Sequence, residues 1–165
     1  MIMSLDGAPT APIIKDSWDG YGVDRRELMT HLAARGIDNV SFLTGDIHTF
    51  FAGDVGLDGR GPESHATEFV GGSITSLGIP ETLEATTGAP PGGRDALALV
   101  GRNLLVSNPH LRYLDEKNRG YGLVEATPQE LRVQFKAVDA MQRTSAARTI
   151  GSFRVASGSQ RVEVA

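Results

Sequence analysis

The hydrophobic pattern changes about two thirds of the way along the chain, and this change limits the folds that the chain can adopt. The first part predicts a helix over Asp24–Gly36, followed directly by a short apolar strand over Asn39–Thr44. After residue 110 come short runs in which apolar and polar residues alternate. A helix joined to an apolar strand indicates a largely buried sheet, whereas alternation indicates an antiparallel meander. Together they predict a layered α/β sandwich with a β-rich C-terminal half.

The first helix has clear end signals. Asp24 and Glu27 have the spacing of a capping box, and Gly36 is a typical helix stop. A second helix is predicted over Asp95–Val106, after a Pro/Gly-rich loop. The other predicted strands are, in chain order, Thr49–Val55, His65–Ile74, Leu111–Leu114, Gly120–Ala126, Leu131–Val138, Thr149–Ala156 and Arg161–Val164.

Composition excludes several classes of protein. The 165 residues predict a single domain over 1–165, with 16 basic against 20 acidic residues and a net charge of −4. This balance lacks the basic footprint of a nucleic-acid-binding protein, and no apolar stretch is long enough to span a bilayer. The absence of cysteine excludes disulfides, thiolate metal ligands and a cysteine nucleophile.

The sharpest local signal is the segment LTGDIH, over Leu43–His48, in which an apolar strand runs into Gly-Asp-x-His. Polar groups at the exit of a buried strand are where α/β folds place their sites. Asp46 and His48, two apart on an extended stretch, would project to the same side and could bind a metal ion. The alternative is that Asp46 caps a turn and His48 is a hydrogen-bonded core histidine.

Three further signals are weaker, and each has a structural alternative. Trp18, Asp19 and Tyr21 lie in the segment DSWDGY and could line a site, or the loop could be anchored by burial of the tryptophan. Glu68 could be a catalytic or metal-supporting carboxylate, or part of an ordinary strand. Arg119, beside a glycine, could contact a phosphate, or form a surface ion pair.

Taken in order, these segments resemble the alkaline phosphatase D (PhoD-like) family of metallophosphoesterases. The resemblance extends from about residue 1 to about residue 138. It is carried by DSWDGY, the helix with its Arg25-Arg26 pair, LTGDIH, TEFVGGSITS, NPHLRYLD and NRGY, which begin or lie at residues 16, 25, 43, 67, 108 and 118.

The resemblance implies an exported enzyme that hydrolyses phosphate monoesters and diesters with iron and calcium. It implies a catalytic domain that is a four-layer α/β/β/α sandwich. By the same resemblance His48 would be an iron ligand, and Asp46, as a hard carboxylate, would suit calcium. Arg119 would contact the phosphate, with Trp18, Asp19 and Tyr21 near the substrate.

The chain also departs from the family pattern, because the family's early Asp-rich metal motifs are absent. It therefore looks like the C-terminal portion of the catalytic domain, and its partner would be the missing N-terminal half or a second copy of itself. A non-catalytic scaffold or binding module is the alternative. A different metal-dependent hydrolase on the same sandwich is a third possibility.

Overall fold

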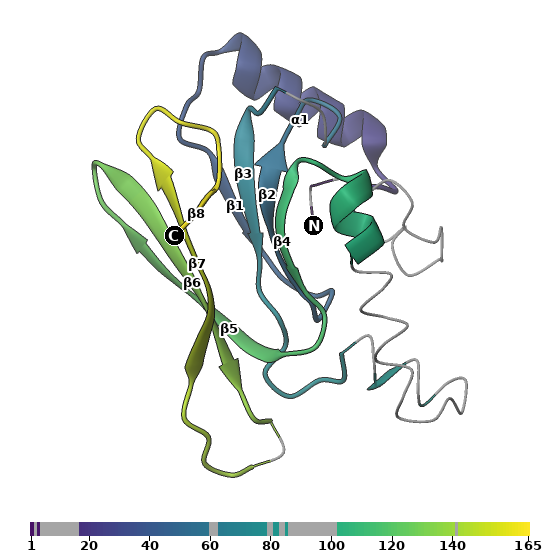
Figure 1. Cartoon of the computed structure of the whole chain (residues 1–165). Coiled ribbons are helices and arrows are strands. Elements are labelled where there is room, and N and C mark those ends of the chain that lie inside the picture. The colour runs from purple at the N-terminus through teal and green to yellow at the C-terminus, as the bar shows by residue number, and fades with distance from the viewer. Residues whose placement is uncertain are drawn as a thin grey trace.

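The computed structural model describes residues 1, 3, 17–59, 63–78, 81–82, 85, 102–140 and 142–165 (Figure 1). The labelled elements are α1 (Gly22–Ala34), β1 (Ser41–Thr44), β2 (Phe50–Val55), β3 (Ala66–Val70), β4 (Leu111–Asp115), β5 (Arg119–Ala126), β6 (Glu130–Val138), β7 (Arg148–Ala156) and β8 (Glu163–Val164). Residues 102–107 are also helical. They form the end of the predicted second helix, whose first part, like Asp16, lies outside the described residues.

The strands form two sheets that pack against each other. The first has the order β1-β3-β2-β4, with β1 and β3 parallel and the other neighbours antiparallel. The second has the order β5-β6-β7-β8 and is antiparallel throughout. α1 lies on the other side of the first sheet, so the described residues form three layers (Figure 1). The fourth layer of the predicted sandwich stays a prediction.

β4 belongs to a different sheet from the one that its sequence pattern predicts. We expected Leu111–Leu114 to begin the antiparallel meander, but β4 pairs with β2 in the first sheet. The chain then turns at Asp115, whose Oδ1 accepts the backbone N–H groups of Lys117 and Asn118 at 2.9 and 2.8 Å. Alternation reveals which face of a strand is buried, but not which strand lies beside it, and this accounts for the error.

The end of α1 follows the sequence prediction. Gly36 has φ 60°, and its N–H donates to the Ala33 carbonyl oxygen while that of Ile37 donates to Leu32. This is the Schellman arrangement that favours glycine.

The start of α1 differs from the prediction. The helix begins at Gly22, with Tyr21 as N-cap and no side-chain capping hydrogen bond, so Asp24 is not the cap. The Arg25 side chain bonds to Asp19 in the preceding turn, which accounts for helical backbone starting earlier. Asp24 instead lies in the first turn, where a negative charge suits the helix dipole.

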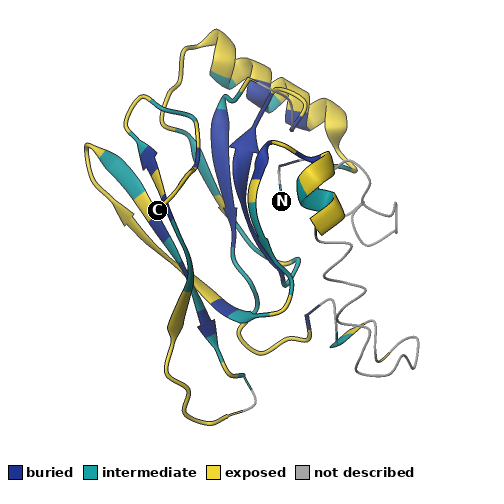
Figure 2. Cartoon of the chain, in the orientation of Figure 1, coloured by how far each residue is buried: buried dark blue, intermediate teal, exposed yellow. Residues whose placement is uncertain are grey.

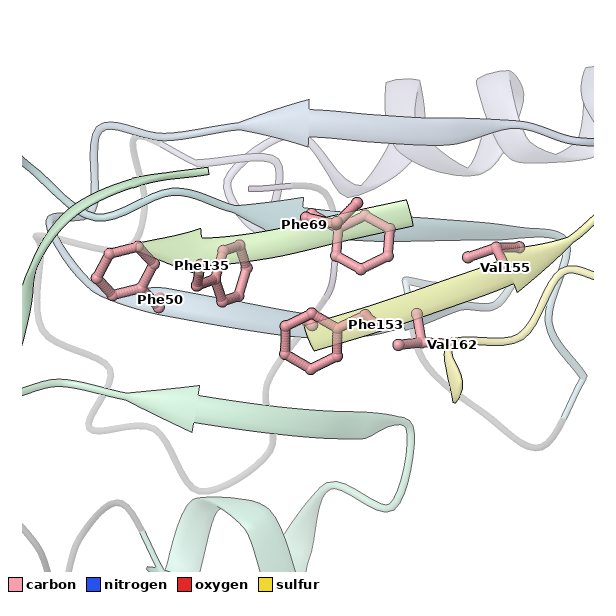
Figure 3. Packing of buried hydrophobic residues seen from close by; sticks show 8 residues of the cluster. Phe50, Phe69, Phe135, Phe153, Val155 and Val162 are labelled. Carbon is pink, nitrogen blue, oxygen red and sulfur yellow. The ribbon is translucent and has the colours of Figure 1, made fainter. Parts of the chain in front are cut away.

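The two sheets enclose an aromatic core. Figure 3 shows side chains from both sheets meeting there, among them Phe50 and Phe69 from the first and Phe135 and Phe153 from the second. The ring centroid of Phe135 lies 5.0 Å from that of Phe50 and 5.1 Å from that of Phe153. Such tilted and edge-on pairs stabilise beyond their buried area. The aromatic residues are few, and five of them gather where the sheets meet: Phe50, Phe69, Tyr113, Phe135 and Phe153.

A second core lies between α1 and the first sheet. Met29 of the helix packs there with Phe51, Val55 and Val70, and Leu28 and Leu32 lie at its margin. Figure 2 shows the consequence: β2 and β3 are buried, whereas the outer surface of α1 is exposed. No described helix is long and apolar enough to cross a membrane.

One buried carboxylate joins the two sheets. The Asp54 side chain on β2 is 4% exposed, and its Oδ2 accepts the Arg112 Nη2 and Nε at 2.6 and 3.1 Å. Its Oδ1 accepts the backbone N–H of Val162, just before β8, at 2.8 Å. A buried carboxylate needs such partners, because leaving water costs several kcal/mol. Asp54 therefore fixes β4 and the end of the second sheet to β2.

Candidate functional site at one end of the sandwich

The candidate residues lie at one end of the first sheet. β1 and β3 are parallel, so their carboxyl ends lie at the same edge, and β4 ends there before the chain enters β5 (Figure 1). The Gly71 N–H donates to the Thr44 carbonyl oxygen at 2.9 Å, so the loops that follow β1 and β3 are adjacent. Strand ends of this kind are common positions for sites in α/β folds.

The loop after β1 is not extended, contrary to the sequence prediction. Asp46 and His48 both have left-handed backbones, with φ 71° and 58°. Between them, Ile47 packs against the core under α1, and its N–H bonds back to the Gly45 carbonyl oxygen at 2.9 Å. The tight turn that brings Ile47 to the core accounts for the two positive φ angles. Each costs on the order of 1–3 kcal/mol, and such residues cluster at functional sites.

His48 is held by a hydrogen bond that defines its chemistry. Its Nδ1 lies 2.7 Å from the Leu77 carbonyl oxygen. A carbonyl oxygen only accepts, so Nδ1 carries a proton, and in the neutral ring Nε2 has the free lone pair. Metal-binding histidines usually have this arrangement. The ring is half-buried and the Asp46 side chain is exposed, so neither is a core residue.

Arg119 is an ion-paired residue. Its Nη2 lies 2.9 Å from Oε1 of Glu81, and its side chain is only 12% exposed. The next residue, Gly120, donates its N–H to the Ser73 carbonyl oxygen at 2.8 Å. A Cβ on Gly120, which has φ 152°, would lie 1.8 Å from the Lys136 carbonyl oxygen, so only glycine fits. Arg119 and Gly120 thus fix the start of β5 against the segment after β3.

The structure does not join the Trp18 loop to Asp46 and His48. Trp18 packs at the margin of the core under α1, and Asp19 pairs with Arg25 at 2.7 Å. Tyr21 is 55% exposed. Among the described residues, no hydrogen bond or ion pair connects these three to the loop after β1. Their contacts match the structural alternative, in which burial of the tryptophan anchors the loop.

Glu68 is a buried carboxylate with structural contacts. It is fully buried on β3, where Oε1 accepts the Thr44 hydroxyl and Oε2 accepts the Met3 N–H, both at 2.7 Å. It therefore ties β1 and residue 3 to β3.

The turn after β4 lies beside Tyr113, whose hydroxyl donates to the Ile150 carbonyl oxygen at 2.9 Å. Burial raises the pKa of Tyr113 far above its ordinary value, and the neighbouring Asp115 carboxylate raises it further. Tyr113 is therefore neutral, and its contacts are structural: it joins the two sheets.

Comparison with known proteins identifies the family of this chain. A model of the PhoD-like phosphatase family matches residues 1–135. The chain belongs to this family. It is 29% identical over 144 residues to alkaline phosphatase D of Bacillus subtilis (strain 168), an alignment that covers 86% of this chain and 22% of that protein. It thus spans about a fifth of that relative.

A solved structure titled "Structure of PhoD" shares the fold. It matches with a TM-score of 0.75 and 24% identity over 99% of this chain, which corresponds to 30% of that chain. This PhoD-like chain therefore covers a portion of a PhoD-like protein, and the likeness extends through both sheets.

In this PhoD-like chain, Asp46 and His48 stand without other metal-binding side chains beside them in the described part. There, no group of three or more His, Cys, Asp or Glu side chains could hold a metal ion. Iron and calcium ordinarily need more ligands than two. A carboxylate oxygen suits calcium and an imidazole nitrogen suits iron. Asp46 and His48 would therefore supply part of a coordination sphere that further ligands complete.

Sequence reasoning missed one positively charged residue at this end of the sandwich. Arg148, the first residue of β7, donates to Oδ1 of Asn118 in the turn before β5. The two residues are 30 positions apart, so no local motif could have connected them. Only the pairing of β5, β6 and β7 brings them together.

Proposed function

We propose that this chain carries part of the active site of a metal-dependent phosphoesterase that acts on phosphate monoesters and diesters. The observation that carries the proposal is the His48 imidazole, held through Nδ1 so that Nε2 is available at the end of β1. Family membership supports the reaction class. The proposal includes iron and calcium as the metals, an exported enzyme, and a complete four-layer sandwich in the longer protein.

In this proposal each residue has a stated role. Nε2 of His48 holds iron and the Asp46 carboxylate holds calcium, or a second metal, in a sphere that other ligands complete. When bound, such metals neutralise phosphate charge and make a hydroxide available at neutral pH. The Leu77 carbonyl oxygen orients His48. The Arg119–Glu81 pair positions the adjoining segments rather than contacting the phosphate.

The His48→Ala variant tests the metal assignment. We expect the longer protein, in which other ligands complete the coordination sphere, to bind iron and its His48→Ala variant to bind it at least about tenfold more weakly, because the ring supplies a direct ligand. Elemental analysis after equilibration with defined iron gives the measurement. Hydrolysis of p-nitrophenyl phosphate and of its bis ester, with each metal added, tests the reaction.

His31→Ala is the matched control, because His31 is exposed on α1 and is not part of the loop after β1. It should bind iron as the unaltered longer protein does. Equal iron binding by His48→Ala and His31→Ala would refute the ligand assignment. A longer protein that binds no metal and hydrolyses neither ester would favour the non-catalytic module.

A further inference from the structure

A groove of about 710 Å³ lies beside the start of β5 and the end of β6. The start of β5 and the end of β6 lie at the same end of the sandwich as the loop after β1 (Figure 1). The residues that line it come from four segments: Leu77, Glu81, Lys117, Asn118, Arg119, Ala137, Val138, Asp139, Ala140, Ser145, Ala146 and Arg148. Of the sequence motifs, NRGY contributes Asn118 and Arg119 to this groove.

The groove carries an excess of positive charge, because Lys117, Arg119 and Arg148 line it together with two carboxylates, Glu81 and Asp139. Glu81 is paired with Arg119, and Asp139 accepts a hydrogen bond from the neutral amide of Gln142 at 2.7 Å. Lys117 and Arg148 have no carboxylate partner among the described residues; the contact of Arg148 is the neutral amide of Asn118. Two such cations in a concave surface attract anions, although the whole chain has a net charge of −4.

Arg148 is held in place through Asn118. Asp115 accepts the Asn118 side-chain amide at 2.6 Å and its backbone N–H at 2.8 Å. The same carboxylate accepts the backbone N–H of Lys117 at 2.9 Å. Because this turn is fixed before any ligand arrives, the guanidinium loses little freedom on binding. A guanidinium that is oriented and has free N–H groups suits an oxyanion, which it can bind with two parallel hydrogen bonds.

The groove adjoins the proposed metal-binding loop. Leu77 lines the groove, and its carbonyl oxygen is the one that holds His48. We propose that Lys117 and Arg148 bind a second phosphate, or a comparable oxyanion, of a substrate whose scissile phosphate lies at His48. This inference rests on the proposed function and deepens it. The favoured substrates are phosphoesters that carry another anionic group beyond the scissile bond.

Inorganic pyrophosphate, titrated calorimetrically in EDTA at fixed ionic strength, tests the groove without any metal. Lys117→Gln and Arg148→Gln should each weaken binding about tenfold, since each removes a charged hydrogen-bond donor. Lys136→Gln is the matched control, because Lys136 lies on β6 but is not among the groove residues and bonds to the Thr149 hydroxyl at 2.7 Å. The pyrophosphate affinity of Lys136→Gln should stay within about twofold of that of the unaltered chain.

Two results would overturn the proposal: unchanged pyrophosphate affinity in Lys117→Gln and Arg148→Gln, or an equal loss in Lys136→Gln. Lys117 and Arg148 are both exposed, so we expect both variants to fold. Amide NMR shifts should concentrate at Asn118, Ala137 and Ala146. Because EDTA removes metal ions, the result of this test does not depend on the proposed metal site.

Discussion

Replacing Phe135 with alanine is expected to lower the free energy of unfolding by about 3–5 kcal/mol. The ring is 1% exposed and packs against Phe50, Tyr113 and Phe153, with centroids 5.0 to 5.8 Å away. Its removal leaves a cavity where the two sheets meet, and neighbours from two different sheets cannot easily collapse into it. Urea denaturation followed by circular dichroism measures the loss.

Tyr121→Ala is the control for this prediction. Tyr121 lies opposite Lys136 in the β5–β6 register, on the other face of the same sheet, and it is 39% exposed. Its substitution should cost less than about 1 kcal/mol. Similar losses in the two variants would contradict a core between the sheets.

Asp54→Ala should cost about 3 kcal/mol, the lower end of the range for breaking a buried ion pair. The variant leaves Arg112 and the Val162 N–H without their carboxylate. The cost stays at the lower end because the Arg112 side chain is 35% exposed and water can reach it. The same denaturation experiment gives the measurement.

Asp58→Ala is the matched control for Asp54→Ala, because it removes an ion pair at the surface. Asp58 lies 2.8 Å from Arg26, but the two side chains are 55% and 67% exposed. Its loss should change stability by less than about 1 kcal/mol. Were Asp58→Ala as damaging as Asp54→Ala, burial would not be the source of the effect.

Local signals predicted the elements well, because local physics decides them. Gly36 ends α1 as expected, and the runs after residue 118 are the strands β5 to β8 to within two residues at most ends. The sheet to which β4 belongs could not be predicted, since alternation is the same in either sheet. That choice depends on the pairing of Phe51 with Leu114, which are 63 positions apart in the sequence.

The candidate site was predicted less completely than the fold. The sequence located the Asp46–His48 loop at a strand end, but it predicted an extended backbone, because burial of Ile47 depends on the core under α1. It proposed Arg119 as a phosphate contact because of the adjacent glycine, with an ion pair as the alternative, but it could not name Glu81 as the ion-pair partner. The metal, the substrate and the roles of these residues stay predictions.

The order of strands in the two sheets has a consequence for folding. β5, β6 and β7 are neighbours in both sequence and space, whereas β1 pairs with β3 across 26 residues and Asp54 binds Arg112 across 58. Short loops close at lower entropic cost, so we expect the meander to acquire structure first. Pulsed hydrogen exchange should protect amides of β5–β7 before those of β1 and β4; the reverse order would contradict this. The proposed metal-binding end would then acquire its structure last, when β1 and β4 pack against a meander that is already formed.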